Sequence, residues 1–407
     1  MGLITLEKTK KGLTVVALLS FFVSLILTEN YRNITVIAFA LLIVLGVISQ
    51  KTYDKKRIRL LVVNTLFFFS ILISLSYSSN KELGLYRVTT MLGMLIFPLG
   101  FFFIKKEYYK KIEKYFYLVF FISTILFFIG VFVHNYFNDF LNENIFRNYA
   151  ERLNSKYGKY SIHPIYASLY VSIAIFFSIR LIERSKTKWM SFLYILGDVF
   201  LAFILFLLAR KGAIFFTAGI VFFYFFYKKN KKGILITSIL LIGLLALIGF
   251  TEAIRARFIE MFIALVDGEN TNKGSTFFRF EVFKCTKELI NESFFFGYGI
   301  GDTKSLLKSC YMEKDAIFNG RYYNTHNQFL GAWISGGILS IGSLIYMLFI
   351  NLKLAIRKSN FIYLAIVLFF FLVLLIENIL ERQNGVLLFS FFINFFAFKT
   401  LEELNNE

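Results

Sequence analysis

The feature that most constrains this chain is a series of long apolar runs separated by short polar connections. A run of about 18 or more apolar residues is long enough to cross a membrane as an α-helix. The strands of a membrane β-barrel would instead alternate apolar and polar residues. Of the 407 residues, 57% are hydrophobic, which is more apolar surface than a soluble domain can bury. The sequence therefore predicts an all-α, polytopic membrane protein.

The apolar runs predict about twelve transmembrane helices. We place them at residues 13–27, 34–49, 60–77, 89–104, 115–133, 165–179, 190–209, 213–227, 234–250, 327–350, 361–376 and 386–398. The first run follows three lysines and leads into further runs rather than into a small-residue cleavage site. We therefore expect it to be a signal anchor and not a cleaved signal peptide.

Every second connection between these runs is short and basic. The basic connections are residues 8–11, 51–59, 105–114, 180–188, 228–232 and 353–358. Because lysine and arginine accumulate on the cytoplasmic side, this alternation predicts cytoplasmic amino and carboxyl termini. Nearly all of the net charge of +19 lies in these segments and the carboxyl-terminal tail. The charge thus reflects topology, so the lipid bilayer is an expected partner and nucleic acid is not.

One connection on the opposite, extracytoplasmic side is much longer than the others. It spans residues 251–326, whereas the remaining outer connections are residues 28–33, 78–88, 134–164, 210–212 and 377–385. We therefore expect nine transmembrane helices in residues 1–250, an extracytoplasmic loop in 251–326, and three helices with a short tail in 327–407. The loop carries ten basic and ten acidic residues, a mixture that favours a folded helical cap. Apolar residues recur at helical spacing across 277–290, which predicts an amphipathic helix at the membrane surface.

Arg210 lies in a short predicted hairpin, Arg210-Lys211-Gly212, between the seventh and eighth helices. A charge at that depth is costly unless it is paired or faces a water-filled cavity. The guanidinium could simply extend to the membrane interface. Alternatively, it could face outward and bind an anionic group, because its planar fork suits phosphate oxygens. Lys211 and Arg87, which are also on the outer side, are further candidates for substrate binding.

The long loop supplies two more candidates. Arg279 lies in the predicted amphipathic helix, where it could bind an anion or could equally be a surface residue paired with Glu281 or Glu288. His326 stands where the loop re-enters the membrane. Imidazole is the usual general base, although a lone histidine is more often a hydrogen-bonded structural residue. The adjacent Asn327 could orient the imidazole ring or bind a sugar hydroxyl.

Other features of the loop carry weaker signals. Cys285 and Cys310 lie in a compartment that permits disulfides, so a disulfide and two free thiols both stay open. Neither cysteine stands at ligand spacing from a histidine, so we expect no metal and no cofactor. Residues 297–301 lack the preceding strand and the spacing of a nucleotide loop, and we interpret them as a turn. Charged residues inside or at the ends of predicted helices usually face a cavity or a partner, and they are Asp198, Glu377, Glu381 and Arg382.

In their order and common sidedness, these motifs resemble the O-antigen ligase superfamily, which also contains O-antigen polymerases. The shared pattern is an arginine near a glycine that opens a span, an arginine heading an amphipathic helix, a Gly-x-Gly turn, and His-Asn at re-entry. Here these are Arg210, Arg279, residues 297–299, and His326 with Asn327. The resemblance covers the chain from about the seventh helix to the end. Lys211 between Arg210 and Gly212, and Ser293 where a proline is frequent, depart from the pattern.

The resemblance implies a metal-independent, inverting glycosyltransferase of lipopolysaccharide or polysaccharide biosynthesis. The donor would be a glycan on undecaprenyl diphosphate. The acceptor would be lipid A–core for a ligase, which we favour, or another lipid-linked glycan for a polymerase. By this analogy Arg210 and Arg279 bind the diphosphate, and His326 deprotonates the acceptor hydroxyl. A transporter of lipid-linked sugars is a more distant alternative, because it would predict more Gly/Pro-broken helices with polar groups at mid-membrane.

Overall fold

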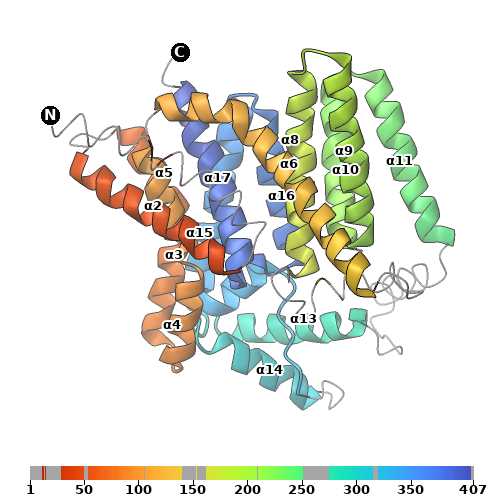
Figure 1. The fold of residues 1–407 in the computed structure, drawn as a ribbon. Helices are drawn as coiled ribbons and strands as arrows, with labels where there is room; N and C mark the ends of the chain where they lie inside the picture. The colour runs from red at the N-terminus through yellow and green to blue at the C-terminus, as the bar shows by residue number, and fades with distance from the viewer. Residues whose placement is uncertain are drawn as a thin grey trace.

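A computed structural model describes residues 12, 14, 29–49, 54–104, 106–139, 153, 162–208, 210–250, 275–314 and 320–404. Over these residues the chain is helical without strands, as the apolar runs predict (Figure 1). Seven of the described helices are long and apolar enough to cross a membrane, and three shorter apolar helices accompany them. The protein is therefore a polytopic α-helical membrane protein. The count of twelve stays a prediction, and the first predicted helix lies almost wholly outside the described residues.

In the described part of the chain, apolar helices follow one another through short connections. Their bounds are α2 Glu29–Ser49, α3 Lys55–Tyr77, α4 Lys81–Thr90, α5 Gly93–Phe103, α6 Lys106–Asp139, α8 Pro164–Glu183, α9 Lys188–Leu207, α10 Lys211–Tyr227, α11 Lys231–Phe250, α13 Ser275–Glu292, α14 Thr303–Lys314, α15 Gln328–Arg357, α16 Phe361–Ile376, the 3-10 helix η3 Ile379–Glu381, and α17 Gln383–Leu404. Four predicted connections were wrong as non-helical segments, because residues 29–33, 81–88, 106–114 and 353–357 are helical. An apolar run marks only the part of a helix inside the hydrocarbon, whereas backbone hydrogen bonding continues into polar residues.

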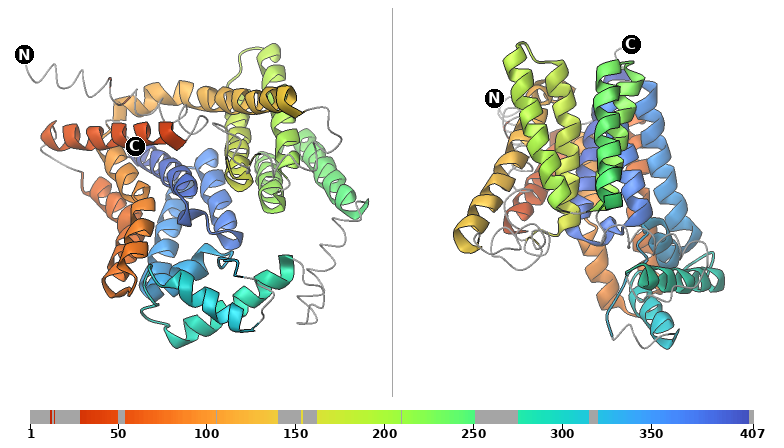
Figure 2. Two further views of the ribbon diagram at one scale, coloured as in Figure 1. Left: turned by 60° about the horizontal axis from the view of Figure 1, so that its bottom comes forward. Right: turned by 90° about the vertical axis from the view of Figure 1, so that its right-hand side faces the viewer.

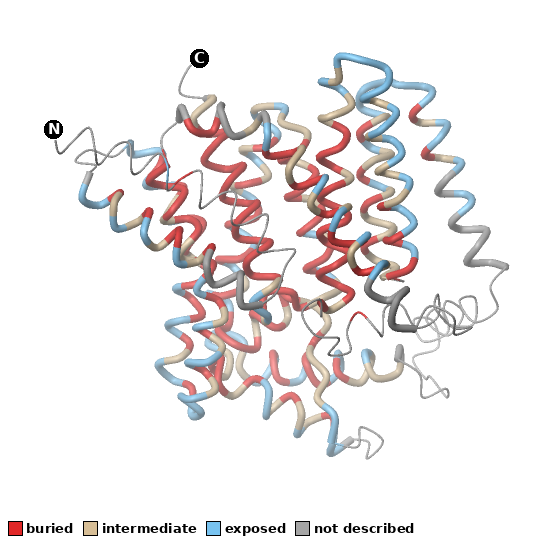
Figure 3. The backbone as a smooth tube through the Cα atoms, viewed as in Figure 1, coloured by how far each residue is buried: buried red, intermediate tan, exposed pale blue. Residues whose placement is uncertain are grey.

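Helix α17 lies at the centre of the bundle, where it packs against α3, α5, α6, α15 and α16. Its side chains from Val386 to Phe398 are buried on every face (Figure 3). A helix that is hydrophobic all round is stable only when other helices surround it. The Phe395 ring stacks on Phe116 of α6, with ring centroids 4.0 Å apart. The apolar core of the bundle is thus organised around α17.

A buried polar network crosses this apolar core. Asn351 of α15 donates to Asn64 of α3, and Asn64 donates to Asn394 of α17, each over 2.8 Å. The Tyr363 hydroxyl of α16 donates to Asn351 over 2.5 Å. Polar groups inside a membrane domain must be satisfied by one another because no water reaches them. The network therefore links four helices in a specific arrangement.

The bundle has two chemically different ends (Figures 1 and 2). Helices α13 and α14 lie across one end, and we call α13, α14 and the segments 293–302 and 320–327 the cap. The turns between α8 and α9 and between α10 and α11 lie at the other end, with the carboxyl terminus (Figure 1). These turns belong to the basic segments 180–188 and 228–232. The cap and the basic turns thus lie on opposite sides of the bundle, in agreement with the predicted alternation.

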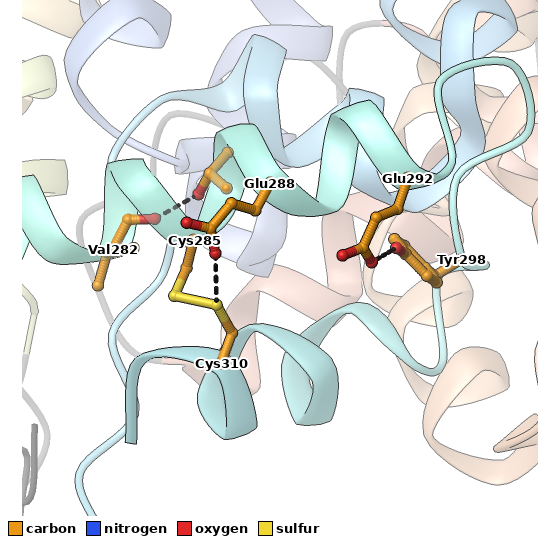
Figure 4. The surroundings of a disulfide bond; sticks show 7 residues. Val282, Cys285, Glu288, Glu292, Tyr298 and Cys310 are labelled. Carbon is orange, nitrogen blue, oxygen red and sulfur yellow. Dashed lines mark hydrogen bonds between the residues drawn. A yellow bond between two sulfur atoms is a disulfide. The ribbon is translucent and has the colours of Figure 1, made fainter. Parts of the chain in front are cut away.

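A disulfide closes the cap. Cys285 of α13 and Cys310 of α14 are bonded, with their Cα atoms 5.9 Å apart (Figure 4). The question that the sequence left open is therefore resolved in favour of the disulfide. Val282, Leu307 and Tyr311 are buried beside it and form a small core that belongs to the cap alone. The predicted amphipathic helix is α13, and its buried side faces α14 as well as the membrane domain.

Helix α15 is broken at Gly336 and Gly337, where the sequence predicts an uninterrupted span. The break removes helical partners from the carbonyl groups of Ile334 and Ser335. The turn at residues 297–299 replaces these partners: Tyr298 N–H donates to Ile334 O, and Gly299 N–H donates to Ser335 O, each over 2.8 Å. In return, Ile338 N–H donates to Phe295 O over 3.1 Å. The glycine turn therefore docks the cap onto a membrane helix, as a turn rather than a nucleotide loop.

The cap is also bonded to the end of α3. The Ile300 and Gly301 N–H groups donate to the hydroxyls of Ser74 and Ser78, over 3.2 Å and 3.0 Å. The Asp302 carboxylate accepts from Asn80 N–H over 2.9 Å. Backbone groups near the membrane need such partners, because water is scarce there. The seam between cap and membrane domain is thus held by backbone hydrogen bonds rather than by side-chain packing alone.

Replacing Gly337 by alanine is expected to destabilise this seam. Gly337 has φ of 61°, and an added Cβ would lie 2.0 Å from Phe295 O, which is a backbone atom and cannot move aside cheaply. Backbone strain of this kind costs about 1–3 kcal/mol before the lost hydrogen bonds are counted. Thermal unfolding of the purified protein should show a clear fall in Tm. The matched control is Gly342→Ala on the same helix, which meets nothing within 4 Å and should leave Tm unchanged or slightly higher. Equal Tm values for the two variants would contradict the docking role.

Candidate functional site

Three of the predicted site residues come together around one carboxylate, Glu377. The Arg279 Nη2 atom lies 3.7 Å from Glu377 Oε1, and His326 Nδ1 lies 3.7 Å from Glu377 Oε2. Arg210 is close enough for its charge to act on Glu377 and on Arg279. Each oxygen of one carboxylate thus faces a different partner. The site combines α10, α13, the end of α16 and the segment before α15.

Hydrogen bonds between two short segments position His326 against Glu377. Glu377 ends α16, and its N–H donates to Val373 O over 2.9 Å. The Asn378 amide that follows donates to Thr325 Oγ1 over 2.8 Å. Leu380 N–H donates to Gln328 Oε1, also over 2.8 Å. Because these bonds lie on both sides of His326, they hold the imidazole beside the end of α16.

His326 itself has an unusual backbone conformation. Its φ is 49°, in the left-handed region that non-glycine residues rarely adopt. The Asn324 side chain accepts a hydrogen bond from His326 N–H over 3.1 Å, which holds this conformation. Asn327 then caps α15, because its Oδ1 atom accepts from the N–H groups of Phe329 and Leu330. The side-chain oxygen of Asn327 is therefore engaged in capping α15. A role of Asn327 in binding a sugar stays a prediction.

Gly212 explains how Arg210 reaches the site. Arg210 precedes α10, which begins at Lys211, so the predicted hairpin is confirmed. A Cβ added to Gly212 would lie 2.1 Å from Ile376 Cδ1, one residue before Glu377. The glycine therefore lets the start of α10 approach the end of α16. Lys211 lies beside Arg210 and is half-buried, and its role in substrate binding stays a prediction.

Two buried nitrogen atoms of this site have no hydrogen-bond partner among the described residues: Arg210 Nε and His326 Nδ1. The 3.7 Å from His326 Nδ1 to Glu377 allows an ion pair but exceeds hydrogen-bond length. A buried donor without a partner costs about 1–3 kcal/mol. Arrangements of this kind are more common at sites that bind a ligand than in structural cores.

The positive groups around Glu377 lower the pKa of its carboxyl more than burial raises it. Burial acts to raise the pKa of the Glu377 carboxyl, but His326, Arg279 and Arg210 together hold that pKa below its ordinary value. Burial lowers the pKa of Arg210, with Glu377 opposing that shift and Arg279 adding to it. The carboxylate is therefore ionised at neutral pH. Two guanidinium groups face a single carboxylate, so the site carries a positive excess that suits an anion.

A second histidine, His163, also borders this site. It precedes α8, and its Nδ1 atom accepts from Ile165 N–H over 3.4 Å. Burial lowers the pKa of His163 to about 4, and the charges of Arg210 and Arg382 act in the same direction. The imidazole is therefore neutral at neutral pH. The side chain of the remaining histidine, His134, lies outside the described residues.

Arg87 of α4 lines a separate small cavity of about 20 Å³ with Gln328 and Glu381. Its Nη1 atom donates to Ile300 O over 3.4 Å. Arg87 also interacts with the Tyr322 hydroxyl, whose pKa burial raises. Arg87 thus contributes to the contact between cap and membrane domain, and its role in substrate binding stays a prediction.

A larger cavity of about 220 Å³ lies between the ends of α6, α8, α10, α16 and α17. It is polar, but its carboxylates are paired with cations: Glu183 with Arg180 and Lys228, and Glu113 with Arg184 and Lys399. These ion pairs hold helix ends together. Around Glu377, by contrast, two buried nitrogen atoms lack hydrogen-bond partners among the described residues, so we place the candidate site there.

The residues of the site offer little to a metal ion. Among the described residues, the group with ligand spacing is Cys285, Glu288 and Cys310, and its two sulfur atoms form the disulfide. Disulfide sulfur is not the thiolate that metals bind. Around Glu377, two arginines would repel a cation. The donor set therefore does not fit a catalytic metal.

The sequence analysis nominated Arg210, Arg279 and His326 as site residues but did not include Glu377 among them. The available signal was a carboxylate directly after an apolar run, which the sequence flagged as a group that needs a partner. The partner could not be named, because Arg279 is 98 residues earlier in the chain and meets Glu377 only through the fold.

Comparison with known proteins bears on this site. Residues 196–345 match the family described as O-Antigen ligase. The matched region contains Arg210, Arg279 and His326, whereas Glu377 lies beyond it. No curated protein matches the chain. The chain is thus a polytopic membrane protein whose residues 196–345 are similar to the O-antigen ligase family, the family that the order of its motifs predicted.

Proposed function

We propose that this protein is a glycosyltransferase that moves a glycan from undecaprenyl diphosphate to an acceptor sugar hydroxyl. We place the reaction at the periplasmic face of the bacterial inner membrane, with both termini in the cytoplasm. The preferred acceptor is lipid A–core, which makes the protein an O-antigen ligase. The O-antigen ligase domain supports the class of reaction, and the basic turns opposite the cap support the orientation.

The observation that carries this proposal is the unsatisfied positive charge beside Glu377. Among the described residues, Arg210 Nε is buried without a hydrogen-bond partner, and the ion pair of Arg279 is the 3.7 Å contact to Glu377. A diphosphate would supply oxygen acceptors for both guanidinium groups. Because charge on the diphosphate grows as the glycosidic bond breaks, fixed cations stabilise the transition state more than the ground state.

His326 has the position of a general base in this reaction. The acceptor hydroxyl attacks the anomeric carbon, and its proton passes to the His326 imidazole. The bond from the anomeric carbon to the diphosphate oxygen breaks, and its electron pair stays on that oxygen, next to Arg210 and Arg279. Attack opposite the leaving group inverts the anomeric centre. The new glycosidic bond replaces the old one, so no cofactor is consumed.

The polysaccharide profile of a strain lacking this protein tests the assignment. A ligase predicts lipid A–core without attached glycan while long lipid-linked chains accumulate. Core that carries a single repeat unit would instead assign the protein as a polymerase. An unchanged lipopolysaccharide and capsule, together with no transfer by the purified protein from a lipid diphosphate donor, would overturn the proposed function.

Glycan transfer by the purified protein is expected to survive removal of divalent ions. Arg210 and Arg279 take the place of a metal at the diphosphate, so added EDTA should change the initial rate by less than about twofold, against the tenfold or larger losses when a charge-stabilising group is removed. The measurement is transfer in detergent after dialysis against EDTA, with added Mg²⁺ as the control. A loss of activity that Mg²⁺ or Mn²⁺ restores would contradict this prediction.

A further inference from the structure

We propose that Glu377 is the internal counter-ion of the donor site and the positioning residue of His326. Its carboxylate lies between the cations that the diphosphate neutralises when the donor binds. When the donor binds, Arg279 exchanges Glu377 for phosphate oxygens, and Glu377 remains with His326. This inference rests on the proposed function for its catalytic part, but its anion-binding part is testable without glycan transfer.

The geometry supports one carboxylate with two separate partners. Glu377 Oε1 faces Arg279 and Oε2 faces His326 Nδ1, both at 3.7 Å. Both distances exceed the donor–acceptor distance of a hydrogen bond, which is about 2.7–3.2 Å. A carboxylate held between two loose partners can release one and tighten on the other by a small side-chain movement. A residue with only a structural role would be expected to make closed contacts to both.

The backbone around Glu377 is fixed, so the exchange concerns side chains only. Asn378 and Leu380 are hydrogen bonded to Thr325 and Gln328, and Gly212 packs against Ile376. Arg279 is the mobile member by its environment, because its side chain is 51% exposed whereas Glu377 is 21% exposed. An exposed ion pair contributes little free energy. The Arg279–Glu377 pair is therefore one that an arriving diphosphate can displace.

The titratable groups that interact with Glu377 come from four places in the fold. They are Arg210 before α10, Arg279 on α13, His326 before α15 and His163 before α8, and Arg382 after η3 acts on His163. His163 is neutral near pH 7, so Glu377 is the carboxylate that balances Arg210 and Arg279. Without it, two guanidinium groups would repel each other in a partly buried site.

Contact with Glu377 also selects which nitrogen of His326 serves as the base. A carboxylate beside Nδ1 favours the tautomer in which Nδ1 carries the proton, and this leaves Nε2 unprotonated toward the acceptor. The acceptor O–H proton then moves to Nε2, and the imidazolium that forms is stabilised by the Glu377 carboxylate. Glu377 touches neither donor nor acceptor in this scheme and acts through His326.

The first experiment measures anion binding with inorganic pyrophosphate as the probe. Isothermal titration of the purified full chain in detergent compares wild type with Glu377→Gln. Removal of the competing carboxylate is expected to tighten pyrophosphate binding about two- to fivefold, the range of a part-exposed ion pair. The control is Glu281→Gln, a carboxylate on the same helix as Arg279 that pairs with Lys284 and should leave binding unchanged.

The second experiment measures transfer kinetics on the same proteins. Glu377→Gln is expected to lower kcat about 10- to 100-fold, as for other carboxylates that orient a functional histidine, while KM for the donor falls or stays constant. Glu377→Asp should recover part of kcat because it restores the charge. A merely structural defect would raise KM, lower kcat and lower Tm together, and aspartate would not restore turnover.

The outcomes separate the two proposals. Tighter pyrophosphate binding with reduced kcat supports both roles of Glu377. Equal or weaker binding by a folded Glu377→Gln variant overturns the counter-ion, and an unchanged kcat overturns the positioning role. If no protein transfers glycan, the proposed function fails, whereas the binding comparison still decides the counter-ion. If Glu377→Gln does not fold, Glu377→Asp serves instead, because withdrawing the carboxylate by one methylene should also tighten pyrophosphate binding.

Discussion

Replacing His326 by asparagine is expected to reduce glycan transfer by about 10²- to 10⁴-fold, the range of a lost general base. Asparagine tolerates the left-handed backbone that His326 adopts with φ of 49°, so the segment between cap and α15 should keep its conformation. Its amide cannot accept the acceptor proton. Initial rates of transfer to the acceptor, at saturating donor, measure the loss.

Two comparisons show whether that loss is chemical. The variant should bind pyrophosphate within about twofold of wild type, because a general base contributes to the reaction more than to ground-state binding. His326→Ala should lose activity equally but also lower Tm, since alanine is strained at positive φ. Full transfer by His326→Asn would remove the imidazole from the mechanism.

Replacing Arg210 by methionine is expected to lower kcat/KM for the donor by about 10²- to 10³-fold, the cost of removing one group that stabilises developing negative charge. The same change should keep or raise Tm. The buried Nε atom of Arg210 lacks a hydrogen-bond partner among the described residues, which costs free energy in the folded protein. Methionine is apolar and of similar length, so it avoids that cost. Activity and stability should therefore move in opposite directions.

Arg210→Lys distinguishes charge from geometry. Lysine keeps the positive charge but loses the planar fork, so its activity should lie between wild type and methionine. Lys186→Met, in the turn between α8 and α9, is the matched control for loss of one cation at the opposite end of the bundle, and it should transfer normally. Donor kinetics of Arg210→Met that equal those of wild type would show that the guanidinium does not contact the diphosphate.

The parts of the fold that sequence predicted are those encoded locally. Apolar runs gave the membrane helices, helical spacing gave α13, and the Arg210 hairpin fell where α10 begins. The parts that were missed depend on contacts distant in sequence. The break of α15 at Gly336 and Gly337 is stable because a turn about 40 residues earlier supplies its hydrogen bonds. The pairing of Cys285 with Cys310 likewise follows from how α13 packs on α14.

The candidate site follows the same division. Arginine near a glycine and histidine at a membrane boundary are recognisable by residue type alone. Glu377 has no motif of its own, and its importance comes from the hydrogen bonds that place residues 378–380 beside residues 325–328. A carboxylate at the end of a membrane helix indicates that a partner exists, but the sequence does not identify the partner, because the contact depends on how the helices pack.

The docking of the cap onto broken helix α15 has a mechanical consequence. The cap is fixed at residues 295–301, just beyond the end of α13, by hydrogen bonds that are costly to break near lipid. Arg279 lies 13 residues from that end of α13, about 20 Å along a helix that rises about 1.5 Å per residue. Helix α13 is therefore fixed at the glycine turn, and its orientation sets where Arg279 lies. A tilt of about 5° about that turn would displace Arg279 by about 1.5–2 Å over such a length, so the docked cap must hold α13 in place for the side chains of Arg279 and Glu377 to stay within reach of each other.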